Sequence, residues 1–256
     1  PLSEIQKVIP SVKVGSPDLV GLPFFPLGGQ LTYPLEIGGV ANNIYARSLD
    51  PNCPKRHRHT KLSNEFTDIP HGGFNMYEAF QKEMRKQNSL LIVDEAPLNV
   101  ETFIQISTDA PSVVGLVGLN NDVLFELLAD FPGDLLVSLN NDDPKFDEET
   151  GEQLFDKYGK PEGMSGQKNT IVVAQKVKNL GFRGNVLTFT KPFVRSYPQV
   201  KYNDLNQFWT EYGHSRGELI KARSFIESIA ELPDPNWGPE ELKAFWIRNY
   251  PVVVKK

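Results

Sequence analysis

The sequence predicts an α/β fold built on a mostly parallel sheet with flanking helices. Three apolar runs have the length and composition of buried strands, at residues 90–94, 113–117 and 135–139. Helical periodicity marks residues 98–107, 120–130 and 167–180, and a last strand is expected at 185–190. Buried strands that alternate with helices are typical of a parallel sheet.

The chain is expected to divide into three parts. Residues 1–88 form a small β-rich subdomain of short strands and glycine turns, which ends in an amphipathic helix over 74–88. Residues 89–200 form the α/β unit. Residues 201–256 form a helical tail, in which helices are predicted at 204–212, 217–229 and 239–248.

A polar insertion interrupts the α/β unit at residues 144–165. It is rich in Asp, Glu, Gly and Lys. Its two halves, 146–149 and 155–158, are expected to form a hairpin around Gly151. Because the insertion directly follows Asp143, we expect it to act as a flap over a ligand site at that end of the sheet. The many carboxylates suggest a calcium loop, but their spacing does not match an EF-hand, which favours a solvated surface excursion instead.

The composition excludes several classes of protein. The chain has 256 residues, of which 39% are hydrophobic and 23% charged, as in ordinary globular proteins. No apolar run approaches the roughly 20 residues of a membrane span, and no segment has the pattern of a signal peptide. Cys53 is the only cysteine, which excludes a disulfide framework and favours the reducing cytoplasm. The net charge of −5 argues against general affinity for nucleic acid.

A local basic cluster lies at residues 55–61, with Arg47 just upstream. Such a cluster is suited to contact phosphates, and the alternative is a solvated loop. His57 and His59 within it suggest a zinc site, but no cysteine pair or H-x-x-x-H spacing supports one.

Acidic side chains follow two of the predicted strands. Glu95 follows the first apolar run, while Asp142 and Asp143 follow the third. In open α/β sheets, ligands bind at the carboxyl ends of the strands, and carboxylates there commonly hold magnesium. Loop solvation or helix capping is the alternative explanation for these residues.

Two segments resemble the motifs of the Toprim domain. Residues 93–99 (Val-Asp-Glu-Ala-Pro-Leu-Asn) resemble its first motif, a strand that ends in glutamate, glycine, two further residues and aspartate. Residues 138–142 (Ser-Leu-Asn-Asn-Asp) resemble its second motif, a strand that ends in Asp-x-Asp. Residues 166–168 (Gly-Gln-Lys) and the helix after them resemble the turn and helix that follow this motif.

The upstream part resembles the N-terminal half of the core of bacterial and phage replicative primases. The matching segments are residues 24–27, residues 46–49, Lys61 with Asn64 and Thr67, and residues 71–77 (His-Gly-Gly-Phe-Asn-Met-Tyr). The resemblance runs from about residue 23 to about residue 210, and the order and spacing of the motifs carry it.

The resemblance implies a primase that joins nucleotides on single-stranded DNA with Mg²⁺ or Mn²⁺. Glu95 and Asp142 would be the catalytic acids. The metal set would comprise Glu95, Asn140, Asp142, Asp143 and Asp204. The residues that bind nucleic acid would be Arg47, Arg56, Arg58, Lys61 and Lys168. The resemblance also implies nucleotides as ligands, allows a replicative helicase as a partner, and is typical of phages and mobile elements.

The chain departs from the Toprim pattern at three positions. Asn99 and Asn140 stand where the family has aspartate, and Ala96 replaces the glycine. Because metal affinity follows the number of ligand charges, two missing carboxylates weaken a magnesium site. A catalytically degenerate Toprim-like module that only binds nucleic acid is therefore the alternative to an active primase. A Toprim nuclease is a third reading, which the primase-like upstream half does not favour.

Overall fold

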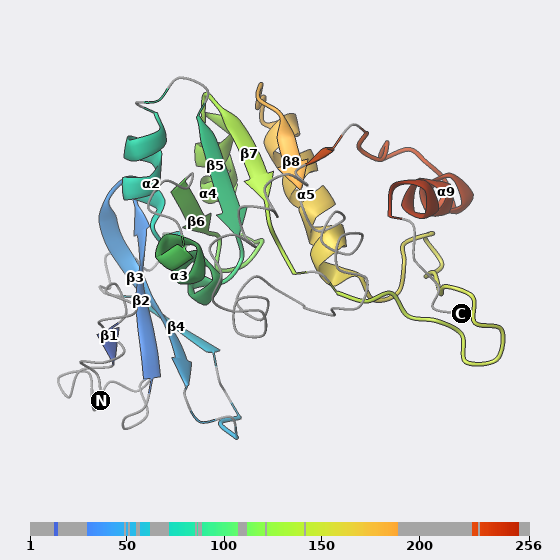
Figure 1. Ribbon diagram of the computed structural model, residues 1–256, viewed down its shortest axis with the longest axis horizontal. Coiled ribbons are helices and arrows are strands. Elements are labelled where there is room, and N and C mark those ends of the chain that lie inside the picture. The colour runs from blue at the N-terminus through green and yellow to red at the C-terminus, as the bar shows by residue number, and fades with distance from the viewer. Residues whose placement is uncertain are drawn as a thin grey trace.

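A computed structural model describes residues 13–14, 30–48, 50, 52–54, 57–61, 72–84, 86, 89–106, 112–120, 122–140, 142–188, 227–229 and 231–250. The described chain forms two sheets, an antiparallel one of four strands and a mostly parallel one of five (Figure 1). Within these residues, no helix is both long and apolar enough to cross a bilayer.

The antiparallel sheet confirms the predicted β-rich subdomain. Its strands are β1 (Lys13–Val14), β2 (Gln30–Ile37), β3 (Val40–Ser48) and β4 (His57–Lys61), in the order β1-β2-β3-β4. Strand β4 contains most of the basic cluster and pairs with β3, so that His57 lies opposite Arg47. The cluster is thus part of an ordered sheet, and not only of a loop.

The second sheet has the predicted parallel core. Its strands are β5 (Leu90–Asp94), β6 (Ser112–Gly115), β7 (Asp134–Val137), β8 (Val186–Thr188) and β9 (Glu227–Ser228), in the order β6-β5-β7-β8-β9. The first four are parallel, and β9 is antiparallel to β8. The helices are α2 (Met76–Glu83), α3 (Pro97–Ile106), α4 (Asp122–Ala129), α5 (Ser165–Asn179) and α9 (Pro239–Asn249).

The prediction of a helix over residues 217–229 is wrong at its end. Residues 227–228 form β9, where Leu187 pairs with Ser228, and Ile229 N donates to Val186 O at 2.8 Å. Strand β8 has only three residues and needs a partner on its outer side. Pairing with a distant strand overrides the local helical pattern here. The predicted helix at 204–212 lies outside the described residues, and the one at 239–248 is confirmed by α9.

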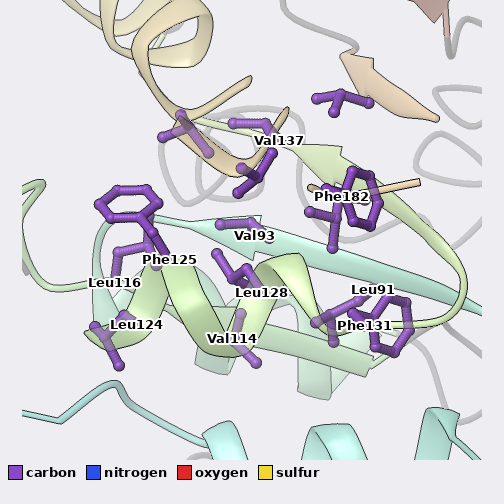
Figure 2. Packing of buried hydrophobic residues seen from close by; sticks show 14 of the residues in the cluster. Leu91, Val93, Val114, Leu116, Leu124, Phe125, Leu128, Phe131, Val137 and Phe182 are labelled. Carbon is purple, nitrogen blue, oxygen red and sulfur yellow. The ribbon is translucent and has the colours of Figure 1, made fainter. Parts of the chain in front are cut away.

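The main core lies between the parallel sheet and the helices that cover it (Figure 2). Leu91 and Val93 of β5 and Val114 next to them pack against Phe125 and Leu128 of α4. All five side chains are buried. The apolar runs that predicted the strands therefore form the center of this domain.

A short segment joins the two sheets by backbone hydrogen bonds. Gly73 exchanges two bonds with Glu36 of β2, at 2.9 and 3.1 Å. Its neighbour Phe74 exchanges two with Gly115 of β6, at 2.8 and 3.0 Å. Two consecutive residues thus connect β2 to β6, and the basic strand is fixed relative to the parallel sheet.

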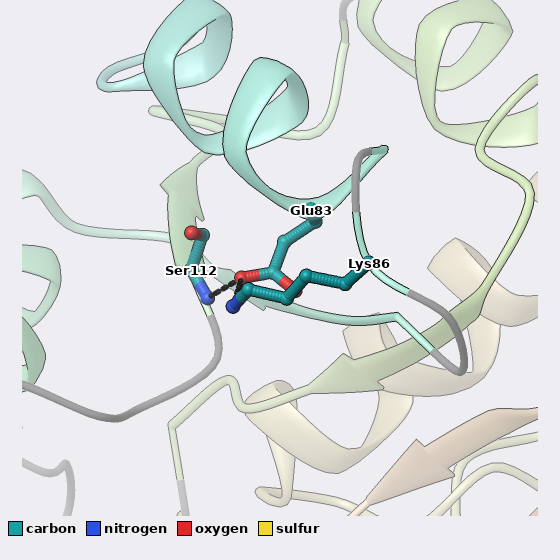
Figure 3. Close-up of polar contacts among 3 residues, drawn as sticks. All are labelled: Glu83, Lys86 and Ser112. Carbon is teal, nitrogen blue, oxygen red and sulfur yellow. Dashed lines mark hydrogen bonds and ion pairs between the residues drawn. The ribbon is translucent and has the colours of Figure 1, made fainter.

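Glu83 provides a second link, between α2 and β6 (Figure 3). Its buried Oε1 accepts hydrogen bonds from Ser112 N at 2.8 Å and from Lys86 Nζ at 2.7 Å. Burial opposes ionisation of this carboxyl, but the bonds from Lys86 and Ser112 outweigh it, so the pKa of Glu83 is lowered. The folded state therefore favours the ionised form.

The insertion forms two successive turns, which corrects the prediction that 146–149 pairs with 155–158. Phe146 forms a bridge with Gln153 around Gly151, and Phe155 forms a separate bridge with Pro161. Asp side chains explain this choice, because Asp147 Oδ1 accepts bonds from Thr150 and closes the first turn locally. The role of the insertion as a flap stays a prediction.

The insertion and α9 share a second hydrophobic core. Buried Met164 and Ile171 pack with Phe245, Trp246 and Tyr250. The second turn also meets the start of α9, since a Cβ at Gly159 would lie 2.0 Å from Pro239 O. Helix α9 is therefore packed against the insertion.

We predict that Gly72→Ser destabilises the fold by more than about 2 kcal/mol, because a Cβ there would lie 2.3 Å from the backbone of Glu36. Thermal unfolding followed by circular dichroism measures the change. The matched control is Gly238→Ser, where the nearest atom to a built Cβ is 3.6 Å away and serine suits the helix N-cap. Equal melting temperatures for the two variants would contradict the close packing of the sheet junction.

We predict that Glu83→Ala destabilises the fold by about 2–3 kcal/mol at pH 7, since the buried Ser112 N–H loses its acceptor. Because the pKa of Glu83 is lowered, its stabilisation is present above the ordinary pKa of 4.5 and is lost as pH falls through the folded-state value. Denaturant unfolding at pH 7 and pH 3 tests this. The exposed Glu78, on the same helix, is the control, and Glu78→Ala should change stability by less than about 0.5 kcal/mol.

Candidate functional site

Two predicted acids lie at the same edge of the parallel sheet. Glu95 directly follows β5, and Asp142 lies beyond the end of β7. The two strands are adjacent and parallel, with Val93 opposite Val137. The structure thus brings Glu95 and Asp142 together at the carboxyl edge, where open α/β sheets bind ligands.

Glu95 is half-buried, and its carboxyl interacts electrostatically with that of Asp142. Burial raises the pKa of the Glu95 carboxyl, and the negative charge of Asp142 raises it further. Two carboxylates that repel each other form a site that a cation would stabilise. Their proximity is the main chemical feature of this edge.

The loop after β6 is tied to the same site. Val117 N donates to Glu95 O at 2.9 Å, and Leu116 N donates to Asp94 O at 2.9 Å. Val117 has a φ of 53°, which is unusual and strained for a β-branched residue. No sequence motif indicated this loop, although its glycines at 115 and 118 are a signal of unusual backbone conformation.

Asp142 is also fixed by helix α5. Its Oδ2 accepts a hydrogen bond from Gly166 N at 2.7 Å, and its backbone O accepts one from Gln167 Nε2 at 3.0 Å. A Cβ at Gly166 would lie 1.7 Å from Asn140 O, so only glycine allows the helix to start this close. Asp142 therefore does cap helix α5, as the alternative explanation expected. The same hydrogen bond also orients the Asp142 carboxylate at the sheet edge.

Asn99 is hydrogen-bonded to Asp94, the acid that immediately precedes Glu95. Its Nδ2 donates to Asp94 Oδ1 at 3.0 Å, and Ala96 N donates to the same oxygen at 3.0 Å. Both Asn99 and Asp94 are buried. Aspartate at position 99 would face the carboxylate of Asp94, so the asparagine suits this particular neighbour.

The other proposed ligands occupy different settings. Asn140 is half-buried next to the start of α5, and Asp143 is exposed with its backbone O bonded to Met164 N at 3.1 Å. Asp204 lies outside the described residues. Among the described part of the chain, no group of three or more His, Cys, Asp or Glu side chains is arranged to hold a metal ion.

These residues fit a divalent cation in part. Glu95 and Asp142 supply two converging carboxylates, and Asn140 can add an oxygen from its amide. Magnesium binds such oxygen donors and completes its shell with water and substrate phosphate. The zinc alternative at His57 and His59 gains no support from the described residues, since a zinc site needs three or four such ligands.

The predicted basic residues are only partly brought together. Arg47 on β3 lies opposite His57, while Arg58 and Lys61 occupy β4 opposite Ala46 and Asn43. Arg56 lies outside the described residues. Lys168 Nζ donates to Pro161 O at 3.0 Å, so this lysine is tied to the insertion.

Glu101 on α3 is a buried acid that no sequence motif indicated. Within the described part of the chain, neither carboxylate oxygen has a hydrogen-bond partner. Burial raises its pKa to about 7. Its charge also acts on Tyr33 of β2, whose pKa is raised mainly by burial and then by Glu101. The carboxyl of Glu101 on α3 therefore lies close enough to the Tyr33 hydroxyl on β2 for the two groups to interact electrostatically.

The fold resembles that of solved primases. The Aquifex aeolicus primase structure, of the zinc-binding and RNA polymerase domains, matches with a TM-score of 0.55 at 16% identity over 89% of this chain and 47% of that one. Two further structures also match. A DNA primase domain from Pseudomonas aeruginosa has a TM-score of 0.49 at 13% identity, over 89% of this chain and 60% of that one. The RNA polymerase domain of Mycobacterium tuberculosis primase DnaG has a TM-score of 0.49 at 14% identity, over 96% of this chain and 65% of that one. The chain spans less than two thirds of each of these proteins. No protein-family model and no curated protein matches the sequence.

The comparison confirms the predicted fold class and the resemblance of fold to primase catalytic cores. At 16% identity the likeness is one of fold, so the roles of individual residues depend on the geometry of this chain.

We predict that Asn99→Asp destabilises the protein by roughly 3 kcal/mol at pH 8, because two buried carboxylates would then face each other. The loss should shrink below about pH 5, where a shared proton relieves the repulsion. Thermal melts across this pH range measure it. The exchanged pair, Asp94→Asn with Asn99→Asp, should recover much of the loss; no recovery would contradict the pairing.

Proposed function

We propose that this chain is the nucleotidyltransferase core of a primase, which synthesises primers on single-stranded DNA with Mg²⁺ or Mn²⁺. The observation that carries the proposal is the convergence of Glu95 and Asp142 at the carboxyl edge of a sheet whose fold resembles that of primases. This edge is where such a sheet binds its ligands.

The proposed reaction is attack of a primer 3′ hydroxyl on the α-phosphate of a nucleotide, with release of pyrophosphate. A bound divalent cation would supply positive charge for the phosphates and the hydroxyl. Asp142 would hold that cation from a carboxylate oriented by the start of α5. Glu95, with its raised pKa, is suited to share the cation or to accept the proton of the hydroxyl.

The template would lie along the antiparallel sheet. Arg47 and the basic residues of β4 would contact phosphates, and the junction at Gly73 and Phe74 holds that sheet against the parallel one. The proposal includes a replicative helicase as a partner and the cytoplasm as the compartment. It places the protein in a phage or another mobile element.

A degenerate module that binds nucleic acid is the second candidate. The pair formed by Asn99 and Asp94 favours it, because position 99 supplies no carboxylate and its amide nitrogen is bonded to Asp94. So does the lack of a three-acid group within the described residues. The two candidates share the fold and differ in metal-dependent synthesis.

We predict that the chain makes primers in a manganese-containing reaction with labelled nucleotides and single-stranded DNA, and that Glu95→Gln lowers the rate by at least about 100-fold. Glu148→Gln, on an exposed acid of the insertion, is the matched control and should leave the rate unchanged. Calorimetric titration with Mn²⁺ should show weaker binding to Glu95→Gln than to the parent.

Asn140→Asp separates the two candidates. Synthesis by the parent establishes an active site with an unusual ligand set. Synthesis only after Asn140→Asp indicates a primase scaffold whose metal site has degenerated. Failure of both proteins to make product or to bind Mn²⁺, with DNA binding retained, would contradict the enzyme and support the binding module.

A further inference from the structure

A row of aromatic rings crosses the antiparallel sheet. Phe74 meets Tyr33 edge-on at 5.3 Å between ring centroids, and Tyr33 lies 6.0 Å from Tyr45. Tyr45 then stacks on His57 at 5.9 Å and 30°. The register explains the row, since Tyr33 pairs with Tyr45 and His57 is a diagonal neighbour of Tyr45 on the next strand.

The row runs from the sheet junction to the surface. Phe74, Tyr33 and Tyr45 are buried, whereas His57 is exposed. The three buried rings thus support a fourth ring, on β4. Strand β4 is the last strand in the order of the described antiparallel sheet (Figure 1). An exposed ring with this much support beneath it has a fixed position.

A hydrogen bond fixes the imidazole further. Tyr45 Oη lies 2.5 Å from Nδ1 of His57. When the hydroxyl donates, Nδ1 is the acceptor and the ring is the neutral tautomer that carries its proton on Nε2. Stacking and hydrogen bonding together hold the ring before any ligand arrives, which lowers the entropy cost of binding.

A basic residue lies next to this ring. Arg47 is directly opposite His57 in the backbone register, and position 61 of β4, a lysine, is on the same face as position 57, whereas position 58 is on the other face. Proteins that bind single strands combine a basic track for the phosphates with rings on which bases stack.

We propose that the imidazole of His57 is a stacking subsite for a base of single-stranded DNA, with Tyr45 as its support and Arg47 as the adjacent phosphate contact. This inference rests on the proposed function for the presence of a DNA strand, and it adds a residue that none of the primase-like motifs contains. The ligand is a nucleobase within a strand, because the basic residues extend along β4.

Fluorescence anisotropy with a labelled oligothymidylate tests the subsite on the full chain. His57→Ala should weaken binding by about 5- to 10-fold, which is the loss of one modest stacking contact. His57→Phe, which keeps an aromatic face, should stay within about twofold of the parent. The control is Tyr158→Ala, which removes an aromatic ring that is 59% exposed on the insertion and should have no effect.

Two further measurements separate stacking from charge. His57→Ala should leave the salt dependence of binding unchanged, whereas Arg47→Ala should reduce its slope by about one. On an oligonucleotide with abasic sites, the parent and His57→Ala should bind equally. Equal binding of parent and His57→Ala to oligothymidylate, or rescue by His57→Lys and not by Phe, would overturn the subsite alone.

The source of the base is tested with a nucleoside triphosphate as competitor. If His57→Ala weakened binding of the free nucleotide and left the oligonucleotide unaffected, the assignment to the DNA strand would be wrong. If the parent bound no single-stranded DNA at all, the subsite and the DNA-binding part of the proposed function would both fail. Circular dichroism of each variant confirms that the comparison is between folded proteins.

Discussion

The double backbone bridge at Gly73 and Phe74 is the constraint on which the arrangement of this protein depends. It bonds β2 to β6 through two adjacent residues, each of which exchanges two hydrogen bonds. Backbone bonds have little freedom in length or direction, so the two sheets have one relative orientation. The acids of one sheet and the basic strand of the other are positioned by this junction more than by any side chain.

Local patterns in the sequence predicted the parallel core and the acids at its edge. Strands β5 and β7 are buried on both faces and read as continuous apolar runs, which needs no knowledge of the partner strand. The position of Glu95 and Asp142 then followed from a rule of topology: adjacent parallel strands deliver their ends to the same side.

The features that the sequence did not predict depend on contacts that form only in the folded chain. Strand β9 forms because β8 needs a neighbour, although its own residues have helical periodicity. Lys168, which the resemblance to primases assigns to nucleic acid, donates a hydrogen bond to the carbonyl of Pro161. The Toprim motif predicts aspartate at position 99, but the buried Asn99 donates a hydrogen bond to Asp94, five residues earlier, which aspartate could not do. Such pairings are visible only after the chain is folded.

The shared core of the insertion and α9 has a consequence for dissecting the protein. Met164 belongs to the middle of the chain and Trp246 to its end, yet they are buried together. A truncation before residue 239 would expose the apolar side chains of the insertion, which follows Asp142 in the chain. A deletion of residues 144–163 would remove part of the chain against which α9 packs. The insertion and α9 are far apart in the sequence, but each covers apolar side chains of the other. A shortened version of this protein should therefore keep both segments.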